Sequence, residues 1–72
     1  MSIEKKLELI ADILDVEASE LLPEMPLKNF DWDSVAVLSF IAMMDEEFGR
    51  EMKGEEIKKF VTVQDALDAM EE

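Results

Sequence analysis

The stretch "DSVAVLSFIAMMDEEFG", residues 33–49, decides the fold, because it carries the signals of one complete helix. Asp33 is a natural N-cap, and Gly49 is a natural residue to end the helix. The apolar residues between them recur at i, i+3, i+4, i+7 and i+11, which is typical of a helix with one buried face. These residues are Val37, Phe40, Ile41, Met44 and Phe48. We therefore predict a helix over residues 34–48.

The chain on either side of this helix predicts three more helices. Apolar residues at helical spacing indicate a first helix over Ile3–Leu14. After Gly49, a short helix is expected over Glu55–Phe60 and a last one over Val63–Met70. Thr62 is the expected N-cap of the last helix, with Asp65 at the matching position of a capping box.

Residues 15–32 form a long connection between the first two helices. Pro23 and Pro26 discourage a continuous helix there, although a helical turn at Ser19–Leu22 is compatible with the sequence. The connection is too apolar for a free loop, so we expect it to pack over the core. No run of alternating residues argues for a strand. The predicted fold is all-α: residues 1–72 as a single domain, a small bundle of three longer helices and one short helix with a long first loop.

The charge of the chain limits its partners. Nineteen acidic residues against seven basic ones give a formal net charge of −12. Phosphates would repel such a chain, so nucleic acid and anionic membranes are poor partners, whereas basic patches on other proteins are good ones. The absence of cysteine and histidine excludes a disulfide and a structural metal site with Cys or His ligands.

The apolar runs are too short for a membrane span. The longest, residues 35–38, cannot cross a bilayer, and the first residues do not resemble a signal peptide. We therefore expect a cytoplasmic monomer that does not insert into membranes.

Ser34 raises a chemical question, because it has no base to activate it. Histidine is absent, Lys28 is separated from Ser34 by the loop, and the adjacent acids would hinder an alkoxide. A calcium loop counted from Asp31 would need glycine at its sixth position and glutamate at its twelfth, where Ala36 and Ala42 stand. The plain alternative is that Ser34 only begins the helix.

The surroundings of Ser34 resemble the acyl carrier protein family. The motif of that family is Asp-Ser-Leu at the start of the second helix, usually preceded by Leu-Gly-x, and the aligned residues here are Phe30-Asp31-Trp32-Asp33-Ser34-Val35. The likeness continues through "MMDEEFGREM" and "GEEIKKFVTVQDAL" and spans nearly the whole chain.

The resemblance implies a carrier without catalytic activity of its own. Ser34 would be the attachment point for 4′-phosphopantetheine, which a separate phosphopantetheinyl transferase moves from coenzyme A. Asp33 would serve both as the helix cap and in recognition by the transferase. Loading and using enzymes of ligase, ketosynthase or acyltransferase type would be the further partners, in fatty-acid, lipid or related biosynthesis.

Two further groups of residues receive expected roles. We predict a partner-docking surface on the outward side of the second helix, formed by Val35, Leu38, Ala42, Asp45 and Glu46. The alternative is a wide helix face that the long loop covers. By the resemblance, an acyl chain could lie between the helices against Phe40, Ile41, Met44 and Met70, which are otherwise simply core.

Several positions depart from the pattern of the family. Asp31 stands where glycine is usual, and Trp32 replaces a small residue; Trp32 could contact the arm, a partner or the loop, and we favour the loop. Ala36 and Ser39 stand midway along the helix, where acids facing a partner are common. The lack of acids at Ala36 and Ser39 predicts a specialised carrier with dedicated, more apolar partners. An aminoacyl, peptidyl or D-alanyl carrier and an unmodified helical interaction domain remain alternatives.

Overall fold

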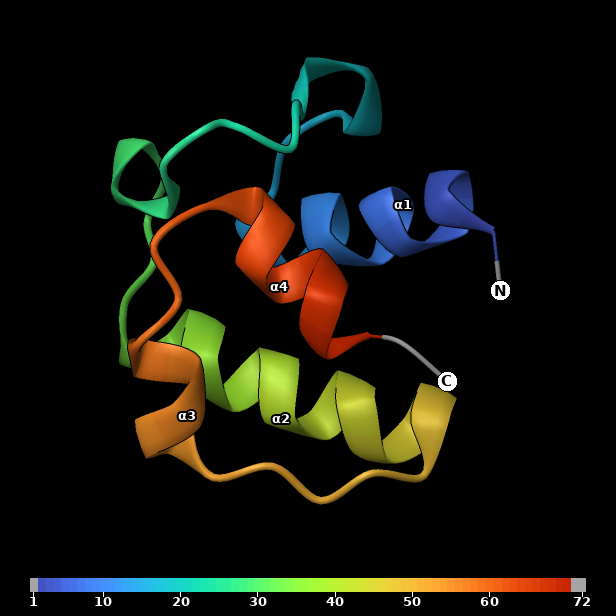
Figure 1. Ribbon diagram of the computed structural model, residues 1–72, viewed down its shortest axis with the longest axis vertical. Helices are drawn as coiled ribbons and strands as arrows, with labels where there is room; N and C mark the ends of the chain where they lie inside the picture. The colour runs from blue at the N-terminus through green and yellow to red at the C-terminus, as the bar shows by residue number, and fades with distance from the viewer. Residues whose placement is uncertain (1, 71–72) are drawn as a thin grey trace.

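Four helices make up the fold of residues 2–70, the part of the chain that this computed structural model describes (Figure 1). They are α1 (Ile3–Leu14), α2 (Ser34–Phe48), α3 (Gly54–Lys58) and α4 (Val63–Ala69). Within these residues no strand forms, and no helix is long and apolar enough to cross a membrane. The prediction of an all-α bundle with three longer helices and one short helix is confirmed.

Both α1 and α2 begin and end where the sequence predicts, because caps define their ends. The hydroxyl of Ser2 accepts a hydrogen bond from the Lys5 backbone N–H at 3.2 Å at the start of α1. Asp15 follows α1 in the left-handed conformation at φ 58°, as Gly49 follows α2 at φ 61°. The left-handed residue that follows each helix donates its backbone N–H to carbonyl groups of the last turn of that helix.

The bounds of the two C-terminal helices differ slightly from the prediction. The predicted helix Glu55–Phe60 is α3, which starts at Gly54 and ends at Lys58. Its last turn tightens, since the Phe60 N–H bonds the Ile57 carbonyl at 3.1 Å, three residues back. This tightening takes Phe60 out of the helix. For a similar reason α4 ends one residue before Met70, whose N–H bonds the Leu67 carbonyl at 3.0 Å.

The long connection holds two short 3₁₀ helices. The first, at Ala18–Glu20, overlaps the predicted turn at Ser19–Leu22, and the second, at Leu27–Asn29, was not predicted. Leu21 and Leu27 are buried, which confirms that the connection packs onto the core.

Backbone hydrogen bonds tie this connection to the start of α4. The Leu27 N–H bonds the Val61 carbonyl at 2.8 Å, and the Gln64 N–H bonds the Pro23 carbonyl at 2.8 Å. An isolated antiparallel bridge pairs Pro26 with Thr62 between these bonds. Local periodicity carries no information on such a pairing, which joins segments far apart in the sequence.

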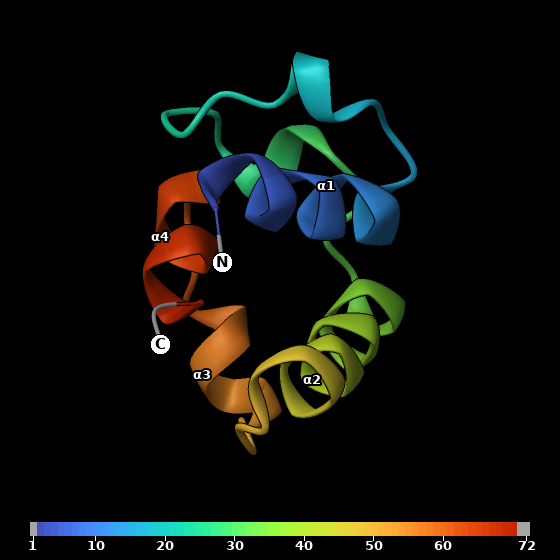
Figure 2. The ribbon, with the colours of Figure 1, turned by 90° about the vertical axis from the view of Figure 1, so that its right-hand side faces the viewer.

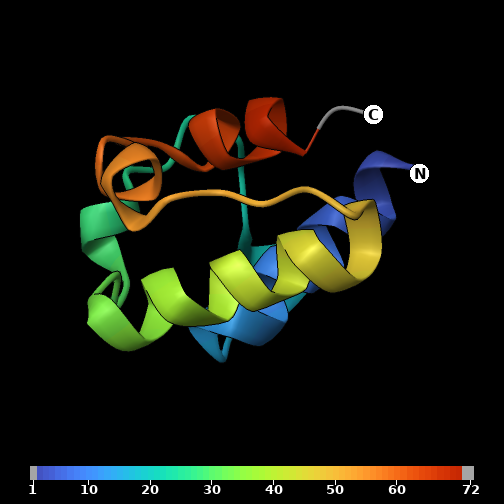
Figure 3. The same ribbon diagram turned by 90° about the horizontal axis from the view of Figure 1, so that it is seen from below.

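The helices surround one hydrophobic core. α1 packs against α2 and α4, and α2 packs against α3, while segment 50–53 runs back along α2 to reach α3 (Figures 2 and 3). Phe40 lies at the centre and makes T-shaped ring contacts with Trp32 and Phe60. The distances between ring centroids are 6.0 Å and 5.6 Å. Other side chains with at most 1% exposure are Ile10, Leu27, Met44, Ile57, Val63, Ala66 and Met70.

Asp65 caps the start of α4, and the stability that it contributes there depends on pH. Its side chain accepts backbone hydrogen bonds from Val61 at 2.8 Å and Thr62 at 3.1 Å, while the Thr62 hydroxyl accepts the Asp65 N–H, which confirms the capping box. The bonds from Val61 and then from Thr62 lower the pKa of Asp65. Because folding lowers the pKa of Asp65, its carboxylate stabilises the folded chain fully at pH values above the pKa that Asp65 has in the unfolded chain. This stabilisation is lost as the pH falls through the pKa that Asp65 has in the folded chain.

Replacing Asp65 by asparagine is therefore expected to lower the melting temperature at neutral pH, because a neutral amide accepts these N–H groups less strongly. The difference between the variant and the original chain should shrink as the pH is lowered through the pKa of Asp65. Thermal melts at a series of pH values measure this. Asp68→Asn is the control, since among residues 2–70 its carboxylate bonds only the side chain of Gln64, on the surface. A pH-independent difference for Asp65→Asn would contradict the assignment.

Candidate functional site

Ser34 is the first residue of α2, and its side chain lies on the surface. Asp33 before it is extended, and its carboxylate accepts the backbone N–H of Ala36 at 3.0 Å. The first bond of the helix ladder runs from the Val37 N–H to the Asp33 carbonyl at 3.0 Å. The N–H groups of Ser34 and Val35 precede this ladder and have no partner among residues 2–70, at the positive end of the helix dipole. A phosphate attached to the Ser34 hydroxyl fits this position.

The Ser34 hydroxyl has no group to activate it. It makes no hydrogen bond with any other residue in the range 2–70, and the chain contains no histidine. A serine nucleophile needs an adjacent base in hydrogen-bond contact. This geometry suits a serine that another enzyme modifies, rather than a serine that performs catalysis.

The cap at Asp33 predicts a difference between two neighbouring carboxylates. Asp33→Ala is expected to lower the free energy of unfolding by about 1 kcal/mol, because an N-cap hydrogen bond of α2 is lost. Asp31→Ala is the matched control: it removes the same charge two residues away, and Asp31 makes no hydrogen bond within the described chain. Urea unfolding of both variants measures the effect. Equal losses would show that charge, and not capping, is what Asp33 contributes.

The five residues of the predicted docking surface are all exposed. Val35 and Leu38 are 69% and 65% exposed, so the long loop does not cover this face of α2. Ala42, Asp45 and Glu46 are exposed as well. Val61, between α3 and α4, is another large apolar residue with high exposure, at 66%, and no pattern in the sequence predicted it.

The interpretation of Ala36 as a residue facing a partner is wrong. Its side chain is only 4% exposed, because it lies one turn before Phe40 on the buried side of α2. Ser39 is exposed, as expected for a residue facing outward. The absence of an acid at position 36 therefore reflects burial, and of these two positions only Ser39 lies on the outer face of α2.

The residues considered for an acyl chain lie in the core. Phe40, Met44 and Met70 are fully buried, and Ile41 is partly buried against them. A chain entering between the helices would have to displace these side chains. Their role as a lining remains a prediction.

Trp32 reaches beyond the loop in which it lies. Its backbone N–H bonds the Phe30 carbonyl at 2.9 Å, and its ring packs edge-on against Phe40 of α2. The indole Nε1 is buried and has no hydrogen-bond partner in the described chain. A buried donor without an acceptor costs about 1–3 kcal/mol, so this contact carries an energetic cost. The prediction of packing within the loop alone missed the contact with the core.

Known proteins match most of this chain. Residues 7–70 match the family model described as "Phosphopantetheine attachment site". The acyl carrier protein of Thermosynechococcus vestitus is 37% identical over 67 residues, which cover 92% of this chain and 83% of that protein. The acyl carrier protein of Nitratidesulfovibrio vulgaris is 37% identical over 70 residues, 94% of this chain and 92% of that protein. A third, from Rubrobacter xylanophilus, is 36% identical over 67 residues, again 92% of this chain and 83% of that protein.

Proposed function

The chain belongs to the acyl carrier protein family, whose members are carriers without catalytic activity, and we propose that Ser34 holds its 4′-phosphopantetheine arm. The thiol at the end of that arm holds cargo as a thioester, which a chain without cysteine cannot do by itself. What supports Ser34 is its position: an exposed hydroxyl at the open N-terminus of α2, with no base beside it.

The partners follow from this role. A phosphopantetheinyl transferase attaches the arm, with Asp33 presenting a charge beside the modified hydroxyl while it caps α2. Loading and using enzymes of ligase, ketosynthase or acyltransferase type then dock on the exposed face of α2. Its apolar residues lie close to Ser34, at Val35 and Leu38, and its acids lie at the far end, at Asp45 and Glu46. A complementary partner has an apolar patch near the arm and basic residues farther along the helix.

The cargo is an acyl intermediate of fatty-acid, lipid or related biosynthesis in the cytoplasm. The middle of the outer face of α2 holds Ser39 and Ala42 and no acid. Charge steering is therefore weak there, which supports a specialised pathway whose enzymes recognise this carrier through apolar contacts.

Intact-mass measurement tests this function. The chain is incubated with coenzyme A and a transferase of broad specificity, and the modified residue is located by fragmentation. We expect a gain of one phosphopantetheine group, attached at Ser34. No gain with several transferases, or attachment at Ser2, Ser19 or Ser39, would contradict the proposal. Loading the modified chain with acyl or aminoacyl groups by their respective ligases then distinguishes the two kinds of cargo.

A further inference from the structure

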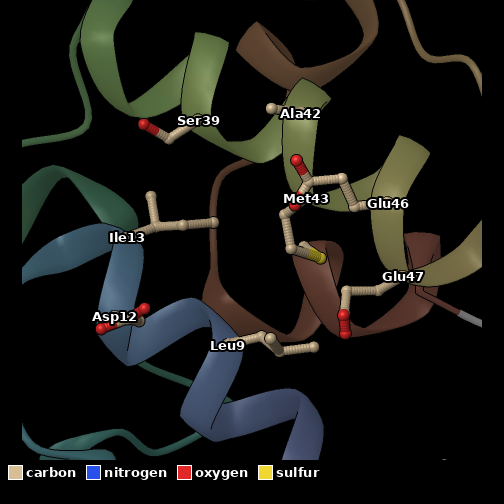
Figure 4. A pocket seen from close by; sticks show the side chains of 8 residues that line it. All are labelled: Leu9, Asp12, Ile13, Ser39, Ala42, Met43, Glu46 and Glu47. Carbon is tan, nitrogen blue, oxygen red and sulfur yellow. The ribbon is translucent and has the colours of Figure 1, made fainter.

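A hollow of about 390 Å³ lies between α1 and α2, beyond the first turn that holds Ser34 (Figure 4). We call it the α1–α2 groove. Leu9 and Ile13 of α1 and Met43 of α2 form its apolar floor, and Figure 4 shows their side chains converging from the two helices. Asp12, Glu46 and Glu47 stand around them on the rim.

The floor of the groove lies at the edge of the hydrophobic core. Ile10 and Leu14 form the buried side of α1, while Leu9 and Ile13 precede each of them by one residue and are only partly buried. An outer helix position next to a filled core is usually polar. Here a second apolar pair, one turn apart, borders the groove together with Met43, whose flexible thioether adapts to different neighbours.

The rim has one sign of charge. The carboxylates of Asp12, Glu46 and Glu47 are exposed, and none of them makes a hydrogen bond or an ion pair with another residue of the range 2–70. No basic side chain lines the groove. The two lysines of α1, Lys5 and Lys6, precede Leu9 by four and three residues, and the Lys5 Nζ lies 4.0 Å from the Glu8 carboxylate.

The carboxylates on the rim limit which kind of molecule can bind in the α1–α2 groove. A fatty-acid anion, a coenzyme A thioester or a nucleic acid would meet three carboxylates of like charge. A second copy of the chain would bring its own net charge of −12. A protein helix with an apolar stripe and flanking lysine or arginine residues satisfies both the floor and the rim.

We propose that the α1–α2 groove docks a cationic amphipathic helix of a partner protein. Aliphatic or aromatic side chains of that helix lie on Leu9, Ile13 and Met43, and its basic residues face Asp12, Glu46 and Glu47. This surface includes α1 and makes no use of Ser34 or the arm. It shares Ala42 and Glu46 with the exposed docking face of α2 but extends over α1, and its existence does not depend on where the arm is attached.

A labelled synthetic helix tests the proposal on the unmodified chain. The probe carries leucines at helical spacing i, i+3, i+4 and i+7 with lysines on both sides, and a peptide of the same composition in scrambled order is the control. Fluorescence anisotropy measures affinity at several salt concentrations, and amide chemical shifts of the isotope-labelled chain locate the contact. We expect binding that weakens with salt, shifts that gather at residues 9–13 and 39–47, and no change of affinity in Ser34→Ala.

Two triple variants with the same change of net charge make the test specific. Neutralising the rim by Asp12→Asn, Glu46→Gln and Glu47→Gln is expected to weaken binding about tenfold at low salt. Neutralising the exposed acids Glu51, Glu55 and Glu56 with glutamine should weaken it far less. Neither set removes a contact of the fold, so both variants should remain folded. Absence of binding, equal losses in the two variants, or shifts gathered around Val35 and Leu38 would overturn the proposal.

Discussion

Replacing Ser34 by alanine is expected to abolish phosphopantetheine attachment completely while leaving the fold intact. The hydroxyl oxygen is the only atom of that side chain that can form the phosphodiester bond, so the loss should be total rather than partial. The fold should survive because the side chain is exposed and its hydroxyl bonds no residue of the described chain. Alanine is also the most favourable helix residue. Intact mass after incubation with coenzyme A and transferase measures the first expectation, and a thermal melt measures the second.

Ser39→Ala is the matched control for this experiment. Ser39 is another exposed serine of α2, a little more than one turn further along the same helix. Its variant should gain the arm at the rate of the original chain. Full modification of Ser34→Ala would contradict the assignment of the attachment residue, and slow modification of Ser39→Ala would show instead that the transferase contacts this part of α2.

Phe40→Ala is expected to destabilise the chain by about 3–5 kcal/mol. Phe40 is fully buried, and its ring contacts Trp32 from the loop and Phe60 from the turn that follows α3. The truncation therefore opens a cavity where three segments meet and also removes two edge-on ring contacts. A chain of 72 residues has a total stability of about 4–11 kcal/mol, so this one change removes much of it.

Urea unfolding at constant temperature measures the loss, and Phe48→Ala is the control. Phe48 is also a phenylalanine of α2, but it is only partly buried at the C-terminal end of the helix. Its truncation leaves a site that opens to solvent, so its cost should be clearly smaller. Equal losses for the two variants would mean that Phe40 does not hold the central position that its contacts indicate.

Local rules predicted the helices well. The bounds of α1 and α2 and the capping box at Thr62 and Asp65 follow from side chains within one turn of each helix end. Such signals are contained in a few adjacent residues. The same signals identify Ser34 as the first residue of α2, and the likeness along the chain adds the chemistry expected there.

Contacts between distant segments were not predictable in this way. The pairing of Pro26 with Thr62, the ring of Trp32 on Phe40 and the burial of Ala36 all depend on how the helices pack. The α1–α2 groove has the same origin. Leu9 and Ile13 lie beside the buried side of α1, and only the position of α2 leaves them at a groove open to a partner.

Trp32 makes the protein fluorescent at a position close to Ser34. It is the only tryptophan, and the chain has no tyrosine, so near-ultraviolet fluorescence of the protein comes from one indole two residues before Ser34. Its ring makes a T-shaped contact with Phe40, and its buried N–H has no partner among residues 2–70, so we expect its emission to respond to the packing of the core and to the arrival of a hydrogen-bond acceptor. We therefore expect the emission of Trp32 to change when the proposed arm is attached at Ser34, which fluorescence can measure without a dye.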